Sequence, residues 1–209
     1  MIHTTNLTFQ YDKAGEIFNF PDMHINNNES VIILGESGIG KTTLLQILAL
    51  LLTPKKGSII IDDIELLSFS EKQKDKYRKD NIGIVFQKPL FFKSLTLLEN
   101  IQAKLLFSKT PYNALEIDKI LTDLNILPYK HKKVTALSEG QKQRAGIALA
   151  IINKPSIILA DEPTSNLDDV NAKRVISLLK GAAAINNSHL ILVTHDKRII
   201  PEFENIVAL

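Results

Sequence analysis

A glycine-rich stretch, GESGIGKTT at residues 35–43, has a spacing that could bind phosphate. It fits G-x-x-x-x-G-K-[ST] and follows a short apolar run, VIILG (31–35), that predicts a buried strand. Glycines let backbone N–H groups converge on one anion, and a helix start adds positive potential. Lys41 would then reach the phosphates, and the Thr42 hydroxyl would bind Mg²⁺. The predicted phosphate-binding residues are Gly35, Glu36, Ser37, Gly38, Ile39, Gly40, Lys41, Thr42 and Thr43.

Two adjacent carboxylates end a second apolar run, SIILADEPT (156–164). Asp161 at the end of a strand could hold Mg²⁺, and Glu162 could polarise a water molecule for attack on a phosphate. On its own, such a pair is more often a solvated strand end. Together with the phosphate loop, it favours hydrolysis of a nucleoside triphosphate.

A polar group precedes a helical pattern in ALSEGQKQR (136–144). Ser138 and Gln141 have the spacing of a capping box, in which both side chains bond backbone amides at a helix start. Taken alone, the stretch predicts only a helix beginning near Gly140.

These residues need a scaffold, which the apolar patterning predicts to be α/β. The segments 2–11 and 17–20 predict an antiparallel N-terminal pair, and strands are predicted at 31–35, 57–62, 82–86, 156–160 and 189–193. Helices are predicted at 41–51, 70–79, 140–152 and 168–179. Strands that alternate with helices imply a parallel sheet covered by helices.

The middle of the chain, 88–136, lacks a convincing strand. Thr96 with Glu99 predicts the start of one helix, and 113–124 predicts another. We interpret 88–136 as a helical subdomain inserted into a single domain that spans 1–209.

Composition narrows the classes of function. The chain has 209 residues, 44% of them hydrophobic, which suits one sizeable core. A net charge of +2 is too small for a dedicated nucleic-acid binder, and we expect no nucleic-acid partner. There is no cysteine for thiolate metal sites. The N-terminus lacks a signal-peptide pattern, and the most apolar run, 43–52, is half the length of a membrane span, so we expect a soluble protein.

Five segments in order resemble the nucleotide-binding subunits of ATP-binding cassette (ABC) transporters: GESGIGKT (35–42), FQ (86–87), LSEGQ (137–141), ILADEPTSNLD (158–168) and VTHD (193–196). The resemblance covers most of the chain. It implies a phosphate-loop (P-loop) NTPase fold of the ABC-ATPase type, with an N-terminal antiparallel β part, the cofactors ATP and Mg²⁺, and ATPase activity.

The resemblance also implies roles for single residues. Ser138, Gly140 and Gln141 would face the γ-phosphate of a nucleotide held by a second copy of the chain. Asp168 would cross the same dimer interface. Glu139 departs from the glycine that is usual there, and we expect its side chain to point away from the phosphates.

Three further residues resemble family positions. Gln87 would contact the metal or the attacking water, and His195 would hydrogen-bond the γ-phosphate, so that Glu162, His195 and Gln87 form the predicted catalytic group. Thr42, Gln87 and Asp161 form the predicted metal group. Tyr11 would stack on adenine, but an aromatic in a small edge-strand core explains it equally well.

The family implies integral membrane permease subunits as partners and a location on the inner face of the cell membrane. The segments FQKPLFFKSLTLLENI (86–101) and DEPTSNLD (161–168) resemble the branch of lipoprotein-release, macrolide-export and cell-division ATPases. Leu149 replaces an arginine that is common in relatives. Two alternatives stay open: an ATPase that powers a non-transport membrane complex, and a soluble DNA-repair or translation ATPase.

Overall fold

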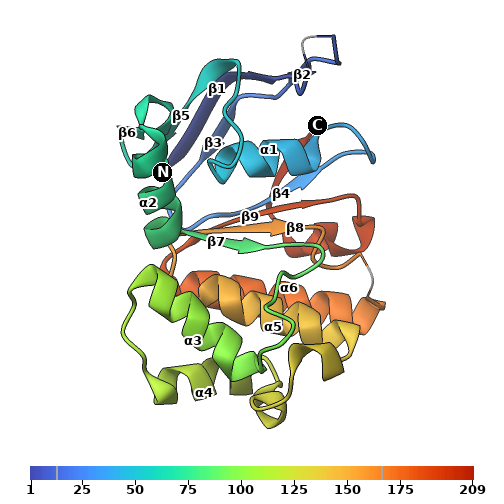
Figure 1. The fold of residues 1–209 in the computed structure, drawn as a ribbon. Helices are drawn as coiled ribbons and strands as arrows, with labels where there is room; N and C mark the ends of the chain where they lie inside the picture. Colours follow the sequence, from blue (N-terminus) through green and yellow to red (C-terminus); the bar gives the residue numbers. More distant parts are fainter. Residues whose placement is uncertain (13, 166) are drawn as a thin grey trace.

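The computed structural model describes residues 1–12, 14–165 and 167–209, and it arranges them in layers (Figure 1). An antiparallel sheet and helix α1 (Lys41–Leu48) lie on one face of a parallel sheet, and longer helices lie on the other face. The antiparallel strands are β1 (Ile2–Phe9), β2 (Phe18–Asn19), β3 (Met23–Ile25), β5 (Lys56–Ile61) and β6 (Ile64–Glu65). The parallel strands are β4 (Ser30–Leu34), β7 (Ile82–Val85), β8 (Ile157–Asp161), β9 (His189–Thr194) and β10 (Asn205–Ala208). The remaining α-helices are α2 (Glu71–Asn81), α3 (Leu97–Ser108), α4 (Ala114–Asp123), α5 (Glu139–Ile151) and α6 (Asp169–Asn186).

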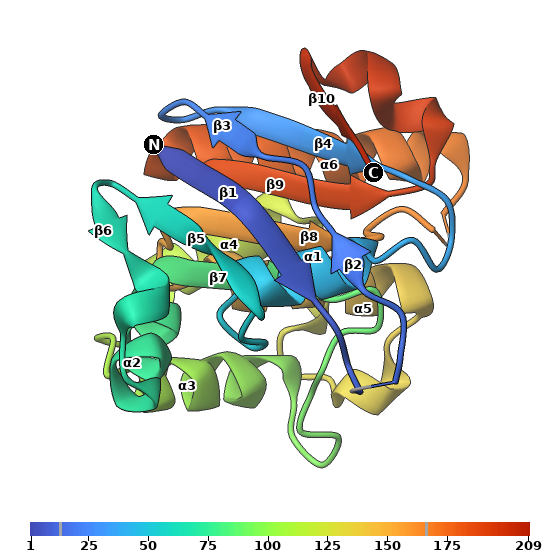
Figure 2. The ribbon, with the colours of Figure 1, turned by 90° about the horizontal axis from the view of Figure 1, so that it is seen from above.

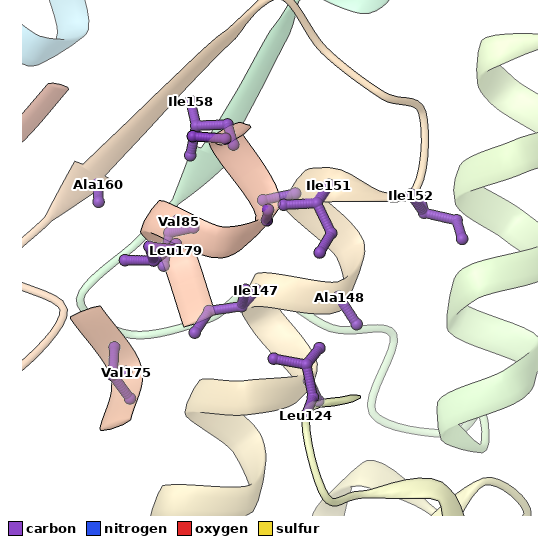
Figure 3. Close-up of a cluster of buried hydrophobic side chains, with 14 of the residues drawn as sticks. Val85, Leu124, Ile147, Ala148, Ile151, Ile152, Ile158, Ala160, Val175 and Leu179 are labelled. Atoms are coloured by element: carbon purple, nitrogen blue, oxygen red, sulfur yellow. The ribbon is translucent and has the colours of Figure 1, made fainter. Parts of the chain in front are cut away.

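The parallel sheet separates two hydrophobic cores. Its strands run in the order β10-β4-β9-β8-β7, and β8 is buried along its whole length. Because successive side chains of a strand point to opposite faces, Ile157 and Leu159 pack toward α1, whereas Ile158 and Ala160 pack toward α5 and α6. Figure 3 shows the core on the side of α5 and α6, in which side chains of these two helices pack against the parallel sheet. The carboxyl ends of the strands are therefore held from both sides.

The antiparallel N-terminal pair is confirmed, since β1 pairs with β2. The expectation that the later strands all join a parallel sheet is wrong for β5, which pairs antiparallel with β1 (Figure 2). Burial explains the difference. After two exposed residues, β5 alternates between half-buried and buried residues, as in a sheet with one solvated face, whereas the central parallel strands are buried on both faces.

Helix ends differ from the predicted ones where the backbone turns left-handed. Helix α1 ends at Leu48 rather than 51, because Leu50 has φ 57° and the amides of Leu51 and Leu52 bond to the Gln46 carbonyl. Helix α6 continues to Asn186, beyond the predicted end at 179. The sequence patterns also missed the short strands β3 and β6 and the last strand, β10.

The middle segment is helical, as predicted. Thr96 and Glu99 form the expected capping box of α3, and Asn113 caps α4. Helices α3 and α4 pack with α5 below the parallel sheet (Figure 1). None of the helices in the described ranges combines the length and apolarity needed to span a bilayer.

Candidate active site

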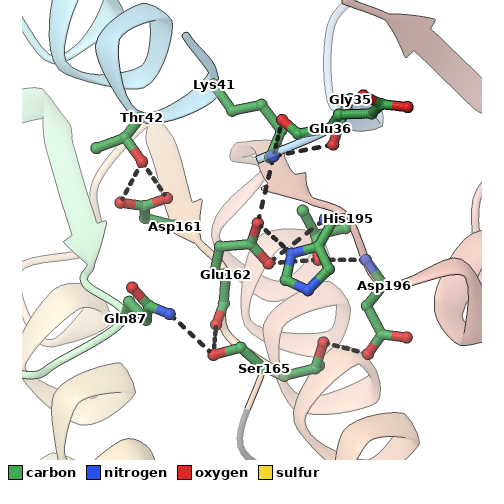
Figure 4. Close-up of polar contacts among 12 residues, drawn as sticks. Gly35, Glu36, Lys41, Thr42, Gln87, Asp161, Glu162, Ser165, His195 and Asp196 are labelled. Atoms are coloured by element: carbon green, nitrogen blue, oxygen red, sulfur yellow. Dashed lines mark hydrogen bonds and ion pairs between the residues drawn. The ribbon is translucent and has the colours of Figure 1, made fainter. Parts of the chain in front are cut away.

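The predicted catalytic and phosphate-binding residues meet at one edge of the parallel sheet (Figure 4). Strands β4, β9, β8 and β7 are neighbours in that order, so their carboxyl ends lie side by side. The phosphate loop follows β4, Asp161 ends β8, and Glu162 comes next. His195 follows β9, and Gln87 lies just beyond β7. Side chains that are distant in sequence can therefore act on one ligand.

The phosphate loop has the backbone conformation that its glycines allow. Gly38 and Gly40 have φ of 89° and 108°, in the left-handed region, and a Cβ at Gly38 would meet no atom within 4 Å. Lys41, buried at the start of α1, donates hydrogen bonds of 2.9 Å to the carbonyl oxygens of Gly35 and Glu36. Its ammonium thus lies over the loop, within reach of an anion bound by the loop amides.

A hydroxyl and a carboxylate face each other beside the loop. The Thr42 hydroxyl lies 3.1 and 3.2 Å from the two carboxylate oxygens of Asp161. Burial raises the pKa of the Asp161 carboxyl, and the hydrogen bond from Thr42 opposes this. Both groups offer the hard oxygen ligands that Mg²⁺ prefers. Within the described residues, no group of three histidine or acidic side chains forms a metal cluster.

Glu162 is the most highly connected residue of the site. Its side chain is 10% exposed and lies 3.6 Å from the Lys41 ammonium and 2.8 Å from Nδ1 of His195. The Thr194 hydroxyl donates a third contact, 2.8 Å, to the other carboxylate oxygen. Glu162 has φ 46°, so the backbone turns sharply after β8. These contacts hold the carboxylate in place, and they leave Nε2 of the half-exposed His195 ring available.

Residues to which no sequence pattern assigned a role support this carboxylate. Besides contacting Glu162, Thr194 accepts a hydrogen bond from the backbone N–H of Asp196. Thr164 and Arg198 both donate to the Asp196 carboxylate, and the bonds from Arg198 lower its pKa to about 2. The available signal was a threonine directly after the apolar run 190–193 of β9.

Two predicted residues lie at the margin of the cluster. Gln87 is exposed, and its amide donates to the Ser165 hydroxyl at 3.3 Å. Tyr11 is 58% exposed, and its hydroxyl lies 2.8 Å from that of Thr43 beside the phosphate loop. The Tyr11 ring also packs edge-to-face on Phe9, with centroids 4.8 Å apart. Both interpretations of Tyr11 therefore remain.

The start of α5 is a capping box, as predicted. The Ser138 hydroxyl accepts from the Gln141 amide, and the Gln141 side chain accepts from the Ser138 amide. Ser138 is exposed, and a Cβ at Gly140 would meet nothing within 4 Å. Glu139 points outward, 85% exposed, and forms an ion pair of 2.7 Å with Lys142. Within the described residues, no hydrogen bond or ion pair joins this helix start to the phosphate loop of its own chain.

Asp168 caps α6. Its carboxylate accepts from the backbone and side-chain nitrogens of Asn171, and these bonds lower its pKa. Asp168 is exposed. Asn166, in the same SNLD stretch, lies outside the described residues.

A glycine loop between a buried strand and a helix, with two carboxylates at the end of the next strand but one in the same sheet, defines a P-loop nucleoside triphosphatase. The comparisons with known proteins narrow this class. The ABC transporter family profile matches residues 18–165. The chain belongs to the ABC transporter family, as an ATP-binding subunit that hydrolyses ATP.

Among curated relatives, the lipoprotein-releasing system ATP-binding protein LolD of Treponema denticola is 36% identical over 93% of this chain and 88% of its own length. The bacitracin export ATP-binding protein BceA of Halalkalibacterium halodurans is 37% identical over 94% and 79%. Among solved structures, the dimeric bacterial ABC transporter cassette MJ0796 superposes with a TM-score of 0.88 at 33% identity, covering 100% of this chain and 94% of that one. The same cassette is also known as a dimer in a post-hydrolysis state with ADP and phosphate, with a TM-score of 0.87, 34% identity and the same coverage.

Proposed function

We propose that this chain binds ATP and Mg²⁺ between two copies of itself and, from the cytoplasmic face of the membrane, drives the membrane subunits of an export system. The observation that carries the proposal is the cluster of Lys41, Glu162 and His195 beside the phosphate loop. The export assignment is supported by the relatives, which are named for lipoprotein release and bacitracin export.

Each group has one task in the proposed reaction. The loop amides and Lys41 bind the β- and γ-phosphates. Thr42 and Asp161 would hold Mg²⁺, which would supply positive charge to neutralise the phosphates. Glu162 orients a water molecule and accepts its proton while the water oxygen bonds to the γ-phosphorus. The bond from that phosphorus to the bridging oxygen breaks, which yields ADP and phosphate.

Two side chains complete the γ-phosphate site. His195 uses Nδ1 to contact Glu162, so Nε2 is the nitrogen that would donate to a γ-phosphate oxygen. Gln87 would contact the metal or the water from the opposite side. Tyr11 would stack on adenine with the exposed face of its ring.

The second copy would present the start of α5. Ser138, Gly140 and Gln141 lie at an accessible helix N-terminus, where backbone amides and the helix dipole favour an anion. Asp168 would contact the partner from the start of α6. The dimeric arrangement of the related cassette MJ0796 supports this assembly.

A groove between the sheet edge and the helical subdomain would receive the membrane subunit. It encloses about 540 Å³ and continues from Phe86, next to Gln87. Its apolar lining includes Pro89, Leu90, Phe91, Phe92, Phe107 and Leu149. Lys104 also lines the groove, and burial lowers the pKa of its ammonium. A carboxylate on the bound membrane subunit would stabilise the charged form of Lys104. Many relatives have arginine at the position of Leu149, and the leucine makes the groove of this chain more apolar.

The test compares Glu162→Gln with Lys41→Ala. In the presence of ATP and Mg²⁺, Glu162→Gln should bind nucleotide, lose at least 100-fold in turnover and accumulate as a dimer on size-exclusion chromatography. Lys41→Ala should neither bind ATP nor dimerise. A monomeric Glu162→Gln with normal turnover would refute the site. Expression with candidate membrane proteins, followed by co-purification from membranes and ATPase assay, tests the partner separately; an active ATPase that never enters a membrane complex would refute the transport role alone.

A further inference from the structure

Two histidines face each other on the antiparallel sheet, at the end of β1 remote from Tyr11. β1 and β3 lie side by side (Figure 2), and their register places His3 directly opposite His24. The ring centroids are 4.1 Å apart, and the two Nδ1 atoms are 2.9 Å apart. His3 is half-buried, whereas His24 is exposed. The ATPase reaction uses neither residue.

The hydrogen-bond partner of each Nε2 atom influences which ring nitrogen carries the proton, and so whether Nδ1 offers a proton or a lone pair. Nε2 of His24 lies 3.2 Å from the side-chain oxygen of Asn26, which can only accept a hydrogen bond. Nε2 of His3 contacts the thioether sulfur of Met1, which is also an acceptor. When each ring carries its proton on Nε2, to match these two acceptors, both Nδ1 atoms are left with a lone pair. The two lone pairs then lie at nitrogens 2.9 Å apart and repel each other unless the two nitrogens share a proton or bind one cation.

We propose that His3 and His24 form a bidentate site for a divalent transition-metal ion of the copper(II) or nickel(II) type. Imidazole nitrogens bind such ions at about 2.0–2.1 Å, so a separation of 2.9 Å corresponds to an angle of about 90° at the metal. Tetragonal Cu²⁺ and Ni²⁺ prefer this angle, whereas tetrahedral Zn²⁺ needs about 109° and a wider pair.

The surroundings suit an open surface site. Asn26 accepts from the distal nitrogen of His24, which is the usual way in which a second residue fixes the tautomer of a ligand histidine. The described residues offer no group of three histidine or acidic ligands, so water would occupy the remaining positions. A metal bound by both rings would join β1 to β3 and stabilise the folded chain, because the unfolded chain does not hold the pair together.

The experiment uses the full chain without a histidine tag. CuCl₂ is titrated and followed by calorimetry and electron paramagnetic resonance, and thermal unfolding is measured with NiCl₂. One Cu²⁺ per chain with couplings to two imidazole nitrogens is expected. His24→Asn should weaken Cu²⁺ binding at least tenfold and abolish the Ni²⁺-induced rise in Tm. His131→Asn, which removes an exposed histidine in the helical subdomain, should change neither.

Three results would overturn the proposal. Unchanged Cu²⁺ affinity in His24→Asn would show that His24 is not a ligand of the metal. Absence of Cu²⁺ binding to the unmutated chain would show that the two Nδ1 atoms share only a proton. Zn²⁺ binding as tight as Cu²⁺ binding would contradict the 90° geometry. The basal ATPase activity of His24→Asn, measured without metal other than Mg²⁺, checks that this variant folds.

Discussion

Replacing Thr194 with valine tests whether Glu162 must be held in one orientation. The change keeps the shape of the side chain and removes the hydroxyl that donates to the Glu162 carboxylate at 2.8 Å. Both side chains are buried, so water cannot replace the bond. A hydrogen bond to a charged group contributes about 1.5–3 kcal/mol. If the bond orients the carboxylate in the transition state, ATP turnover should fall roughly 10- to 150-fold.

The affinity for ATP should change little, because the hydrogen bonds of the Thr194 hydroxyl in the described structure go to Glu162 and Asp196 and not to the phosphate loop. Steady-state phosphate release measures turnover, and fluorescent-nucleotide titration measures binding. Thr194→Ser keeps the hydroxyl and should restore most of the activity, which separates orientation from packing. Because the Asp196 amide also loses its acceptor, a small drop in Tm is expected. Turnover of Thr194→Val within twofold of the unmutated chain would refute the reasoning.

Three further predictions follow from single contacts. The folded-state pKa of Asp196 is about 2, below its ordinary value of 3.8, so its contribution to stability is present above pH 4 and is lost as pH falls toward 2. Asp196→Asn should remove about 1–2 kcal/mol of that dependence in urea unfolding between pH 4 and 2, since the half-exposed Arg198 is screened by solvent. Glu139→Gly, which removes only an exposed ion pair, should leave ATPase activity within a few-fold; a collapse in the same assay would place Glu139 at the phosphates. Tyr11→Leu should raise the Kd for ATP roughly 5- to 150-fold by titration if the ring stacks on adenine, and leave it unchanged if the ring serves only the core around Phe9.

Much of the site could be predicted because its signals are local. The left-handed glycines of the phosphate loop and the capping boxes at Thr96 and Ser138 depend on residues within a few positions of each other. The parallel strands can be recognised in the sequence as short apolar runs, because both of their faces are buried.

The parts that were missed depend on distant residues. β5 pairs with β1 although some fifty residues separate them, and nothing within 57–62 identifies that partner. The role of Thr194 exists only because β8 and β9 are neighbours, which brings its hydroxyl to Glu162. Both features depend on pairing between strands that are distant in the sequence, and the residues of a single strand do not identify its partner.

The reciprocal bonds at the start of α5 have a consequence for recognition. Ser138 and Gln141 already hold one rotamer each through their mutual hydrogen bonds. Freezing such a side chain during association costs about 0.5–1.5 kcal/mol, and here folding has met that cost in advance. Any anion that reaches this helix tip therefore meets a rigid surface, and its affinity reflects the contacts made rather than the ordering of the groups that make them.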